Sequence, residues 1–220
     1  MTGCQAAQEF SFSIQNYFAA HAQIVATLNV QSCQLGIDLI RSTFEAGKKI
    51  ITCGNGGSAS TASHYITDWN KTVNLVTGKS FRGISLCDNI GLITAFGNDT
   101  SYDEIFVGQL RALLDEGDLL VSISGSGNSR NVLRAVEYAN NNGATTLAVV
   151  GYDGGKLMPL AKHSVWIPSF DMQLCEDVSL MFGHMVMKSL CKRPIMIDSG
   201  HFLKGISANK SDHCSAQQQE

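Results

Sequence analysis

Apolar and polar positions along this chain follow two periodicities. In the first fifth, apolar residues recur at helical spacing, which predicts amphipathic helices over 7–28 and 31–46. Further on, short apolar runs alternate with turn residues and helical patterns, and a last amphipathic helix is expected over about 172–191. The runs that we interpret as strands are 50–53, 83–86, 119–123, 146–150 and 164–167. Strands that alternate with helices indicate a three-layer αβα sandwich, in which a five-stranded parallel sheet follows two N-terminal helices.

The domain organisation is expected to be simple. The chain has 220 residues and three prolines, and no linker rich in proline, serine and glycine divides it. We find no internal repeat, and the length suits one large domain with a sizeable core. We therefore predict a single α/β domain over residues 1–202, followed by a polar tail over 203–220.

Composition and charge exclude several classes of protein. The net charge of −3 argues against a general nucleic-acid binder, which usually carries a basic excess. No apolar run reaches the ~18–20 residues of a membrane helix, so no membrane partner is expected. The N-terminus has neither the basic start nor the apolar stretch of a secretory signal. Seven cysteines without a CxxC pair fit reduced thiols, so we expect a cytoplasmic location.

Two turns rich in glycine and serine follow predicted strands. They are 53–60, with the sequence CGNGGSAS, and 124–129, with the sequence SGSGNS. Glycines let the backbone approach a ligand, free amides at a helix start favour an anion, and serine hydroxyls donate without a lysine. The alternative is a tight strand-to-helix connection with serine caps. Neither turn fits the Walker or GxGxxG pattern, which argues against a kinase or a nicotinamide enzyme.

A second group of residues has side chains that bind metals. His64 and Asp68 lie four residues apart, on one face of the predicted helix. Glu176 and His184 lie eight apart, a rise of about 12 Å on a helix, which suits a single ion poorly. Glu176 therefore lies on the turn before the helix, or the two residues serve the sites of different subunits. Half-buried histidines and solvated carboxylates are the ordinary alternative for all four.

Four motifs together resemble the SIS (sugar isomerase) family. They are CGNGGSAS, Gly97-Asn98-Asp99, SISGSGNS and Gly154-Gly155-Lys156, and within the family the chain is most similar to the phosphoheptose isomerases, over about residues 10–192. The resemblance implies the SIS fold and a homotetramer with active sites between subunits. It also implies that the substrate-binding residues are Asn55, Gly56, Gly57, Ser58, Asp68, Asn98, Asp99, Ser124, Gly125, Ser126, Ser129 and Glu176.

The same resemblance gives roles to the metal-binding side chains. It implies one zinc ion held by His64, Asp68, Glu176 and His184, with Asp68 and His184 as the acid–base pair. The family usually has glutamate at position 68 and glutamine at position 176. Asp68 is one methylene shorter, so Glu176 is the alternative base. Two carboxylates would neutralise a divalent ion and weaken it as a Lewis acid.

Two further positions depart from the family pattern. Gly125 stands where a threonine is usual, which removes one hydroxyl donor and predicts weaker phosphate binding. Thr72 stands where an arginine is usual, so the stretch 69–71 suggests a modified substrate pocket. The alternative is an exposed helix end with Trp69 packed at an interface.

The resemblance implies an aldose–ketose isomerase. The expected reaction converts sedoheptulose 7-phosphate to D-glycero-D-manno-heptose 7-phosphate through an enediol, with matched acid and base groups. Isomerisation of another phosphorylated sugar is the near alternative. A non-catalytic SIS protein that binds phosphosugars as a regulator is the alternative from another class, and the presence of His64 and His184 favours an enzyme.

Overall fold

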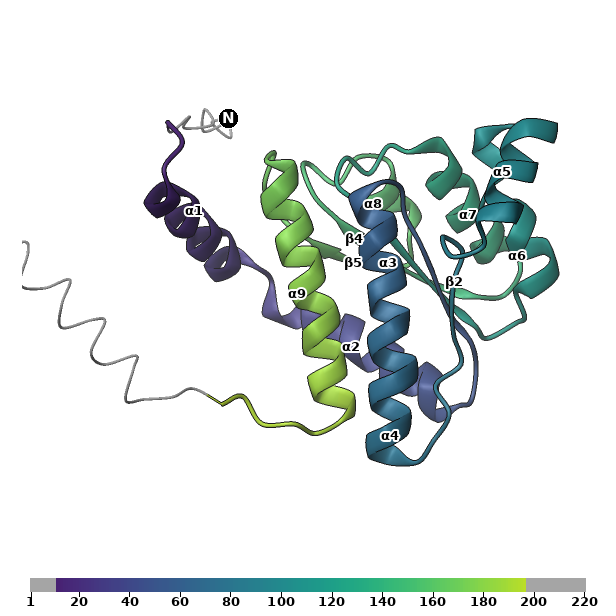
Figure 1. Ribbon diagram of the computed structural model, residues 1–220, viewed down its shortest axis with the longest axis horizontal. Helices are drawn as coiled ribbons and strands as arrows, with labels where there is room; N and C mark the ends of the chain where they lie inside the picture. Colours follow the sequence, from purple (N-terminus) through teal and green to yellow (C-terminus); the bar gives the residue numbers. More distant parts are fainter. Residues whose placement is uncertain (1–10, 197–220) are drawn as a thin grey trace, which may run out of the picture.

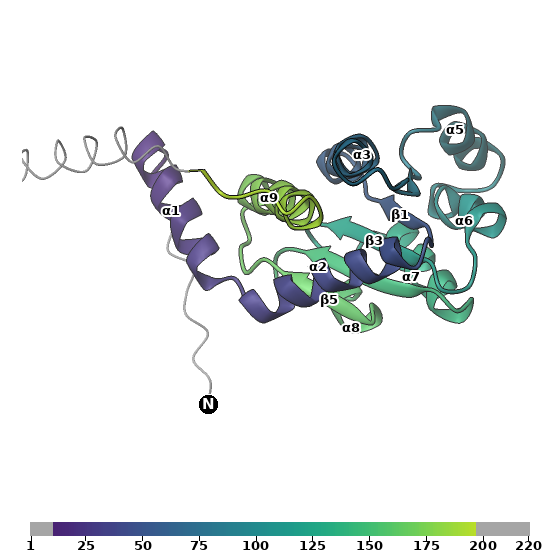
Figure 2. The same ribbon diagram turned by 90° about the horizontal axis from the view of Figure 1, so that it is seen from below.

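In the computed structural model, which describes residues 11–196, a parallel sheet lies between two layers of helices (Figure 1, Figure 2). Its strands are β1 (Ile50–Cys53), β2 (Gly83–Ser85), β3 (Leu119–Ser124), β4 (Thr145–Val150) and β5 (His163–Trp166). All pairs are parallel, and the order across the sheet is β2-β1-β3-β4-β5. The predicted α/β class and five-stranded parallel sheet are confirmed, with each strand end within one residue of its prediction.

The strand order creates a switch point between β1 and β3. From β1 the chain moves to β2 on one side, whereas β3 leads to β4 and β5 on the other side. In open α/β sheets, ligands bind in the crevice that such a reversal leaves beyond the carboxyl ends of the strands. The two glycine-rich turns follow β1 and β3, so the topology brings both to this crevice.

The helices of the described residues vary widely in length. They are α1 (Ile14–Thr27), α2 (Val30–Glu45), α3 (Gly57–Asp68), α4 (Asn74–Thr77), α5 (Ile90–Asp99), α6 (Val107–Leu113), α7 (Arg130–Asn141), α8 (Leu157–Leu160) and α9 (Met172–Leu190). A π-helical turn, η1 (Trp69–Val73), joins α3 to α4, and a 3-10 turn, η2 (Tyr102–Glu104), precedes α6. None of them has the length and apolar character needed to cross a bilayer.

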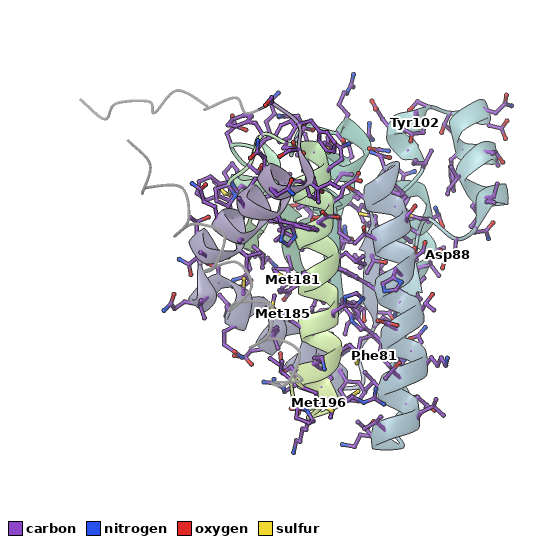
Figure 3. The ribbon with its side chains drawn as sticks, turned by 60° about the vertical axis from the view of Figure 1, so that its left-hand side comes forward. Phe81, Asp88, Tyr102, Met181, Met185 and Met196 are labelled. Carbon is purple, nitrogen blue, oxygen red and sulfur yellow. The ribbon has the colours of Figure 1, made fainter. Side chains whose placement is uncertain are left out.

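Alternate residues of the strands build two cores. Val121 and Ile123 of β3 face the cluster formed with α2, α3 and α9, whereas Leu120 faces the cluster formed with α6, α7 and α8. Strands buried on both faces explain the continuous apolar runs that identified them in the sequence. Helices α3 and α9 lie side by side on one face, with both N-termini at the carboxyl edge of the sheet (Figure 1, Figure 3).

Helix α1 lies at the margin of the domain (Figure 1, Figure 2), where Ile24 and Val25 are partly buried against the core and none of its residues is fully buried. It begins at Ile14, and residues 11–13 are not helical, because the Ser13 hydroxyl caps the helix by accepting from the Asn16 amide at 3.0 Å. The helix predicted over 7–28 is therefore wrong at residues 11–13, which are not helical. The predicted start itself and the polar tail 203–220 lie outside the described residues.

Candidate functional site

A pocket of about 300 Å³ lies beyond the carboxyl ends of β1 and β3. Its lining residues are Asn55, Gly56, Gly57, Ser58, Ile123, Ser124, Gly125, Ser126, Ser129, Met172 and Glu176. Both glycine-rich turns contribute to this lining, as the sequence predicted, and no lysine or arginine belongs to it. An anion in this pocket would therefore be held by amide and hydroxyl donors rather than by side-chain cations.

The first turn opens α3 without a side-chain cap. Gly56 takes the N-cap position with a φ of 56°, a left-handed conformation that favours glycine, and makes no side-chain hydrogen bond. The first amides of α3 thus keep their capacity to donate at the pocket, where the helix dipole favours negative charge. Gly57 lies directly beneath the Glu176 carboxylate, whose oxygens fill the space that a side chain at position 57 would need.

The second turn is folded by its own serines. The Ser124 hydroxyl accepts from the Gly127 amide at 3.1 Å, and the Ser126 hydroxyl accepts from the Asn128 amide at 3.3 Å. Ser129 is the N-cap of α7, yet its hydroxyl makes no capping bond. Because the hydroxyl of Ser129 is uncommitted and that of Ser126 retains its proton for donation, both can donate to a ligand.

The motif at residues 154–156 braces the second turn from outside. The amide of Leu157 donates to the Gly127 carbonyl at 2.9 Å, and the amide of Lys156 donates to the Asn128 side chain at 3.3 Å. A Cβ atom on Gly155 would lie 2.5 Å from the Ser126 carbonyl oxygen. The two loops therefore pack backbone against backbone. This close packing explains why Gly154 and Gly155 are glycines although neither lines the pocket.

An amide network holds the first turn against α7. Asn55 and Asn131 exchange two side-chain hydrogen bonds of 2.9 Å, and the Tyr102 hydroxyl donates to Asn55 Oδ1 at 3.1 Å. Figure 3 shows Tyr102 at the end of the molecule where α3 begins. Neither Asn131 nor Tyr102 is predicted as a site residue from the sequence, because nothing in their spacing from the turn signals the contact.

Asn98 and Asp99 end helix α5 beside each other. The Asn98 side chain donates to Asp99 Oδ1 at 2.8 Å, and both residues are exposed. Neither lines the pocket described above. The structure of a single chain thus brings the two predicted turns together but does not bring this predicted pair to them.

His64, Asp68 and His184 form a compact group between α3 and α9. The two histidine Nε2 atoms are 3.0 Å apart, and Asp68 Oδ2 lies 3.5 Å from His64 Nε2 and 3.8 Å from His184 Nε2. Zinc–ligand distances of about 2.0–2.2 Å put the donors of a tetrahedral site roughly 3.3–3.6 Å apart. The donor types and their spacing therefore fit a divalent metal ion such as zinc.

Glu176 lies apart from this group within one chain. It belongs to the second turn of α9 rather than to a preceding loop, so the prediction that placed it on the incoming turn is wrong. It faces Gly57 and the pocket, while His184 lies eight residues further along the same helix. The three gathered side chains include one carboxylate, Asp68, which leaves net positive charge on a divalent ion. The expected neutralisation by two carboxylates does not hold for the ligands of one chain.

Trp69 is fully buried within its own chain, so the alternative that packs it at an interface is wrong, whereas Lys71 is exposed. Its ring stacks on Tyr65 with a centroid distance of 4.7 Å, and its indole N–H donates to the Gly183 carbonyl at 3.1 Å. Trp69 thus packs inside its own domain, between α3 and α9.

Cys175 adjoins the pocket but is not suited to attack a ligand. Burial raises the pKa of its thiol, and its Sγ donates to the Ser169 carbonyl at 3.2 Å. A nucleophilic cysteine needs a lowered thiol pKa. The cysteines among the described residues are free thiols, which agrees with the reduced cysteines expected from the sequence.

Comparisons with known proteins agree with this arrangement. The family model "SIS domain" matches residues 15–151. The phosphoheptose isomerase of Helicobacter pylori (strain P12) is 37% identical over 177 residues, which cover 79% of this chain and 91% of that protein. Among solved structures, phosphoheptose isomerase from Francisella tularensis superposes with a TM-score of 0.75 at 27% identity, covering 82% of this chain and 97% of that one. The enzyme from Neisseria gonorrhoeae gives 0.71 at 29% identity, with 81% and 98% covered.

Proposed function

The chain belongs to the SIS-domain family and within it to the phosphoheptose isomerases, and from that premise we propose that it converts sedoheptulose 7-phosphate to D-glycero-D-manno-heptose 7-phosphate. The observation that carries the proposal is that a pocket lined by amide and hydroxyl donors and a group of side chains that could hold a metal lie along the same pair of helices. A phosphosugar isomerase needs both features, one to hold the phosphate and one to act on the distant carbonyl carbons.

The spacing of the two features supports a long sugar. Gly57 lines the pocket and His64 belongs to the metal-binding group, and seven helical positions correspond to a rise of about 10 Å. An extended seven-carbon chain with a terminal phosphate, built from bonds of about 1.5 Å, spans roughly 10 Å from C1 to phosphorus. With its phosphate at the glycine-rich turns, such a sugar reaches the group with C1 and C2.

The phosphate end is held by neutral donors. Ser126 and Ser129 donate from their hydroxyls, and the first two residues of α3, Gly57 and Ser58, donate from their backbone amides. Glu176 also lines the pocket, beside Gly57, and its carboxylate is suited to accept hydrogen bonds from sugar hydroxyls. Asn98 and Asp99 complete the proposed substrate contacts in the assembled protein.

Asp68 and His184 carry out the proton transfer. Asp68 removes the proton from C1 of the ketose. His184 donates a proton to the C2 carbonyl oxygen and accepts one from the C1 hydroxyl, so that the carbonyl moves from C2 to C1. His64, Asp68 and His184 would hold a zinc ion, which would supply electrostatic stabilisation for negative charge that develops on the substrate oxygens. Returning the proton to C2 completes the aldose, so the reaction needs no redox cofactor.

The protein acts as a cytoplasmic homotetramer with active sites at subunit interfaces. Helix α1 supports this assembly, because Ile14 and Phe18 are exposed on it and none of its residues is buried in a single chain. In an assembly, Glu176 of one subunit is free to approach the metal-binding group of another. Light scattering is expected to give four times 23.7 kDa, and a monomer at micromolar concentration would refute the shared sites.

The activity is tested with a panel of ketose phosphates of five, six and seven carbons, with and without added zinc. Nuclear magnetic resonance of the product mixture should show aldose formation from the heptulose at a rate well above the shorter sugars. The Asp68→Asn variant, which keeps the pocket, is the matched control. Binding of phosphosugars without turnover in any arm would favour the non-catalytic alternative.

A further inference from the structure

Helix α3 and the π-helical turn that follows it carry two adjacent stripes of side chains, each a pair of residues four positions apart, and the two stripes contact different groups. His64 and Asp68 face the metal-binding group, whereas the residues that follow each of them, Tyr65 and Trp69, are buried against α9. Both pairs have a spacing of four, so each stripe runs along the helix axis. A displacement of the buried stripe would therefore move the ligand stripe with it.

The buried stripe engages α9 at the residues beside His184. The Tyr65 ring occupies the place of a side chain at Gly183, and its hydroxyl donates to the Ser179 carbonyl. The indole N–H of Trp69 donates to the carbonyl of Gly183 at 3.1 Å. One donor from α3 and one from η1 thus hold consecutive turns of α9, and the absence of a side chain at position 183 lets the helices approach closely.

The π-helical turn that begins at Trp69 docks on two sides at once. While Trp69 holds α9, the side-chain amide of Asn70 exchanges two hydrogen bonds with the backbone of Gly83 in the edge strand β2, at 3.0 and 2.9 Å. π-Helical turns cost regular hydrogen bonding and occur frequently at functional sites. Here the turn comes directly after Asp68 and fixes the end of α3 between the sheet and α9.

We propose that Trp69 and Tyr65 are positioning residues of the metal centre, which set the axial register of α9 against α3 and thereby the spacing of His64 and His184. The inference rests on the metal centre of the proposed function. A slip of a single residue along a helix moves a side chain by about 1.5 Å. The Nε2 atoms lie 3.0 Å apart, within reach of one ion. Because a zinc–nitrogen bond is only about 2.0–2.1 Å long, such a slip would take one nitrogen out of bonding distance of an ion held by the other ligands.

The chain offers a matched control for the test. It has two tryptophans, and Trp166 also donates its indole N–H to a backbone carbonyl, that of Tyr152 at 2.9 Å, at a site on β5. Trp69→Phe and Trp166→Phe each keep an aromatic ring and remove one such donor. Zinc affinity of the purified full-length protein is measured by competition with a chelator, and the coordination geometry by the visible absorption of bound Co²⁺.

Trp69→Phe is expected to weaken zinc binding about 10-fold, the lower end of what residues behind metal ligands contribute, and to change the Co²⁺ spectrum. Trp166→Phe should leave both within about twofold. Because Trp166 is 44% exposed and Trp69 is fully buried, thermal unfolding of the metal-free variants should show a stability loss in Trp69→Phe and little change in Trp166→Phe. A purely structural role for Trp69 predicts the stability loss without the change in the Co²⁺ spectrum. That result would overturn the inference.

Tyr65→Phe gives an independent arm that removes a single hydroxyl from a packed ring. It too is expected to lower zinc affinity several-fold, so the inference stays testable if Trp69→Phe does not fold. Unchanged affinity and spectrum in Tyr65→Phe would then refute it. Wild-type protein that binds neither Zn²⁺ nor Co²⁺ would instead refute the proposed metal centre, and the inference with it.

Discussion

Met172 fills the space that a side chain at position 125 would take: a Cβ atom on Gly125 would lie 2.5 Å from the Met172 Sδ atom. The two residues come from different elements, the turn after β3 and the first position of α9, and both line the pocket. The backbone at Gly125 does not have a positive φ, so the methionine rather than the turn geometry disfavours a side chain here.

The first prediction concerns this pair. Gly125→Thr should fold at a cost of about 1 kcal/mol, because the flexible thioether can swing away and only one side chain must adapt. Phosphosugar affinity should rise about 10-fold, since a hydroxyl bound to a charged group contributes about 1.5–3 kcal/mol. Calorimetry measures both binding and unfolding.

Gly127→Ala is the contrasting variant in the same turn. Its φ is 66°, and an added Cβ would meet the backbone carbonyl of Gly154, which cannot swing away. It should destabilise the fold strongly. If Gly125→Thr unfolds as readily as Gly127→Ala, or loses phosphosugar affinity, then the steric explanation of Gly125 is wrong.

The second prediction removes the free hydroxyls of the phosphate turn. Ser126→Ala with Ser129→Ala should weaken binding of the sugar phosphate by about 1.5–3 kcal/mol per lost hydrogen bond to the charged group. Stability should change little, because Ser129 makes no capping bond and Ser126 loses only an exposed bond of 3.3 Å from the Asn128 amide. Ser124→Ala, which removes an internal bond to the Gly127 amide, should instead lower the unfolding temperature. Unchanged affinity in the double variant would exclude this turn from the site.

The third prediction separates the two carboxylates. Asp68→Asn should abolish turnover and reduce zinc content, because Asp68 lies within 3.8 Å of both histidine nitrogens. Glu176→Gln should keep most of its zinc and stay active, since Glu176 faces the pocket rather than these ligands. If Glu176 is the base instead, Glu176→Gln should lose about 10²–10⁴-fold in rate, the usual contribution of a general base. A Glu176→Gln variant with full zinc content and no turnover, beside an active Asp68→Asn, would reverse the assignment.

The fourth prediction concerns pH and helix α1. The Tyr17 hydroxyl donates to Asp177 of α9 at 2.5 Å, and this hydrogen bond is the main cause that raises the pKa of Tyr17 to about 12. Because the folded pKa lies above the ordinary value near 10, the bond stabilises the docked helix fully below about pH 10. That contribution is lost as the pH rises through about 12.

Tyr17→Phe removes the bond at every pH and provides the comparison. The difference in unfolding free energy between wild type and Tyr17→Phe should be present at neutral pH and should vanish as alkaline pH ionises the wild-type tyrosine. Ultraviolet absorbance of tyrosinate should show one titration in the wild type that is absent from the variant. A difference that persists unchanged through pH 12 would refute the role of this bond.

The features that could be predicted from the sequence are those that depend on a local pattern of residues. The five strands appear as apolar runs because both faces of a parallel sheet are buried, and the two turns are identified by glycines that the backbone requires. The spacing of His64 and Asp68 placed them correctly on one helical face. The eight-residue spacing of Glu176 and His184 predicted that one helix suits a single ion poorly with this pair, and the group that the structure gathers contains His184 without Glu176.

The remaining features depend on contacts between distant segments. Tyr102 reaches Asn55 only after α5 and the 3-10 turn have folded back, and no periodicity encodes that path. Met172 appeared as an ordinary apolar helix residue because its partner, Gly125, presents no side chain. The π-helical turn at Trp69 is held by two tertiary contacts, with Gly183 and with Gly83. Because local propensity contains neither contact, the sequence alone predicts an ordinary helix end there.

The central claim is that this chain moves a proton between C1 and C2 of a heptose phosphate. Its most direct test is incubation of the zinc-supplemented protein with sedoheptulose 7-phosphate in deuterium oxide, followed by proton and carbon magnetic resonance. The account predicts that D-glycero-D-manno-heptose 7-phosphate accumulates with deuterium at C2, and that Asp68→Asn forms none. Binding of the heptulose phosphate at the serine-lined pocket without any aldose product, at every zinc concentration tried, would contradict it.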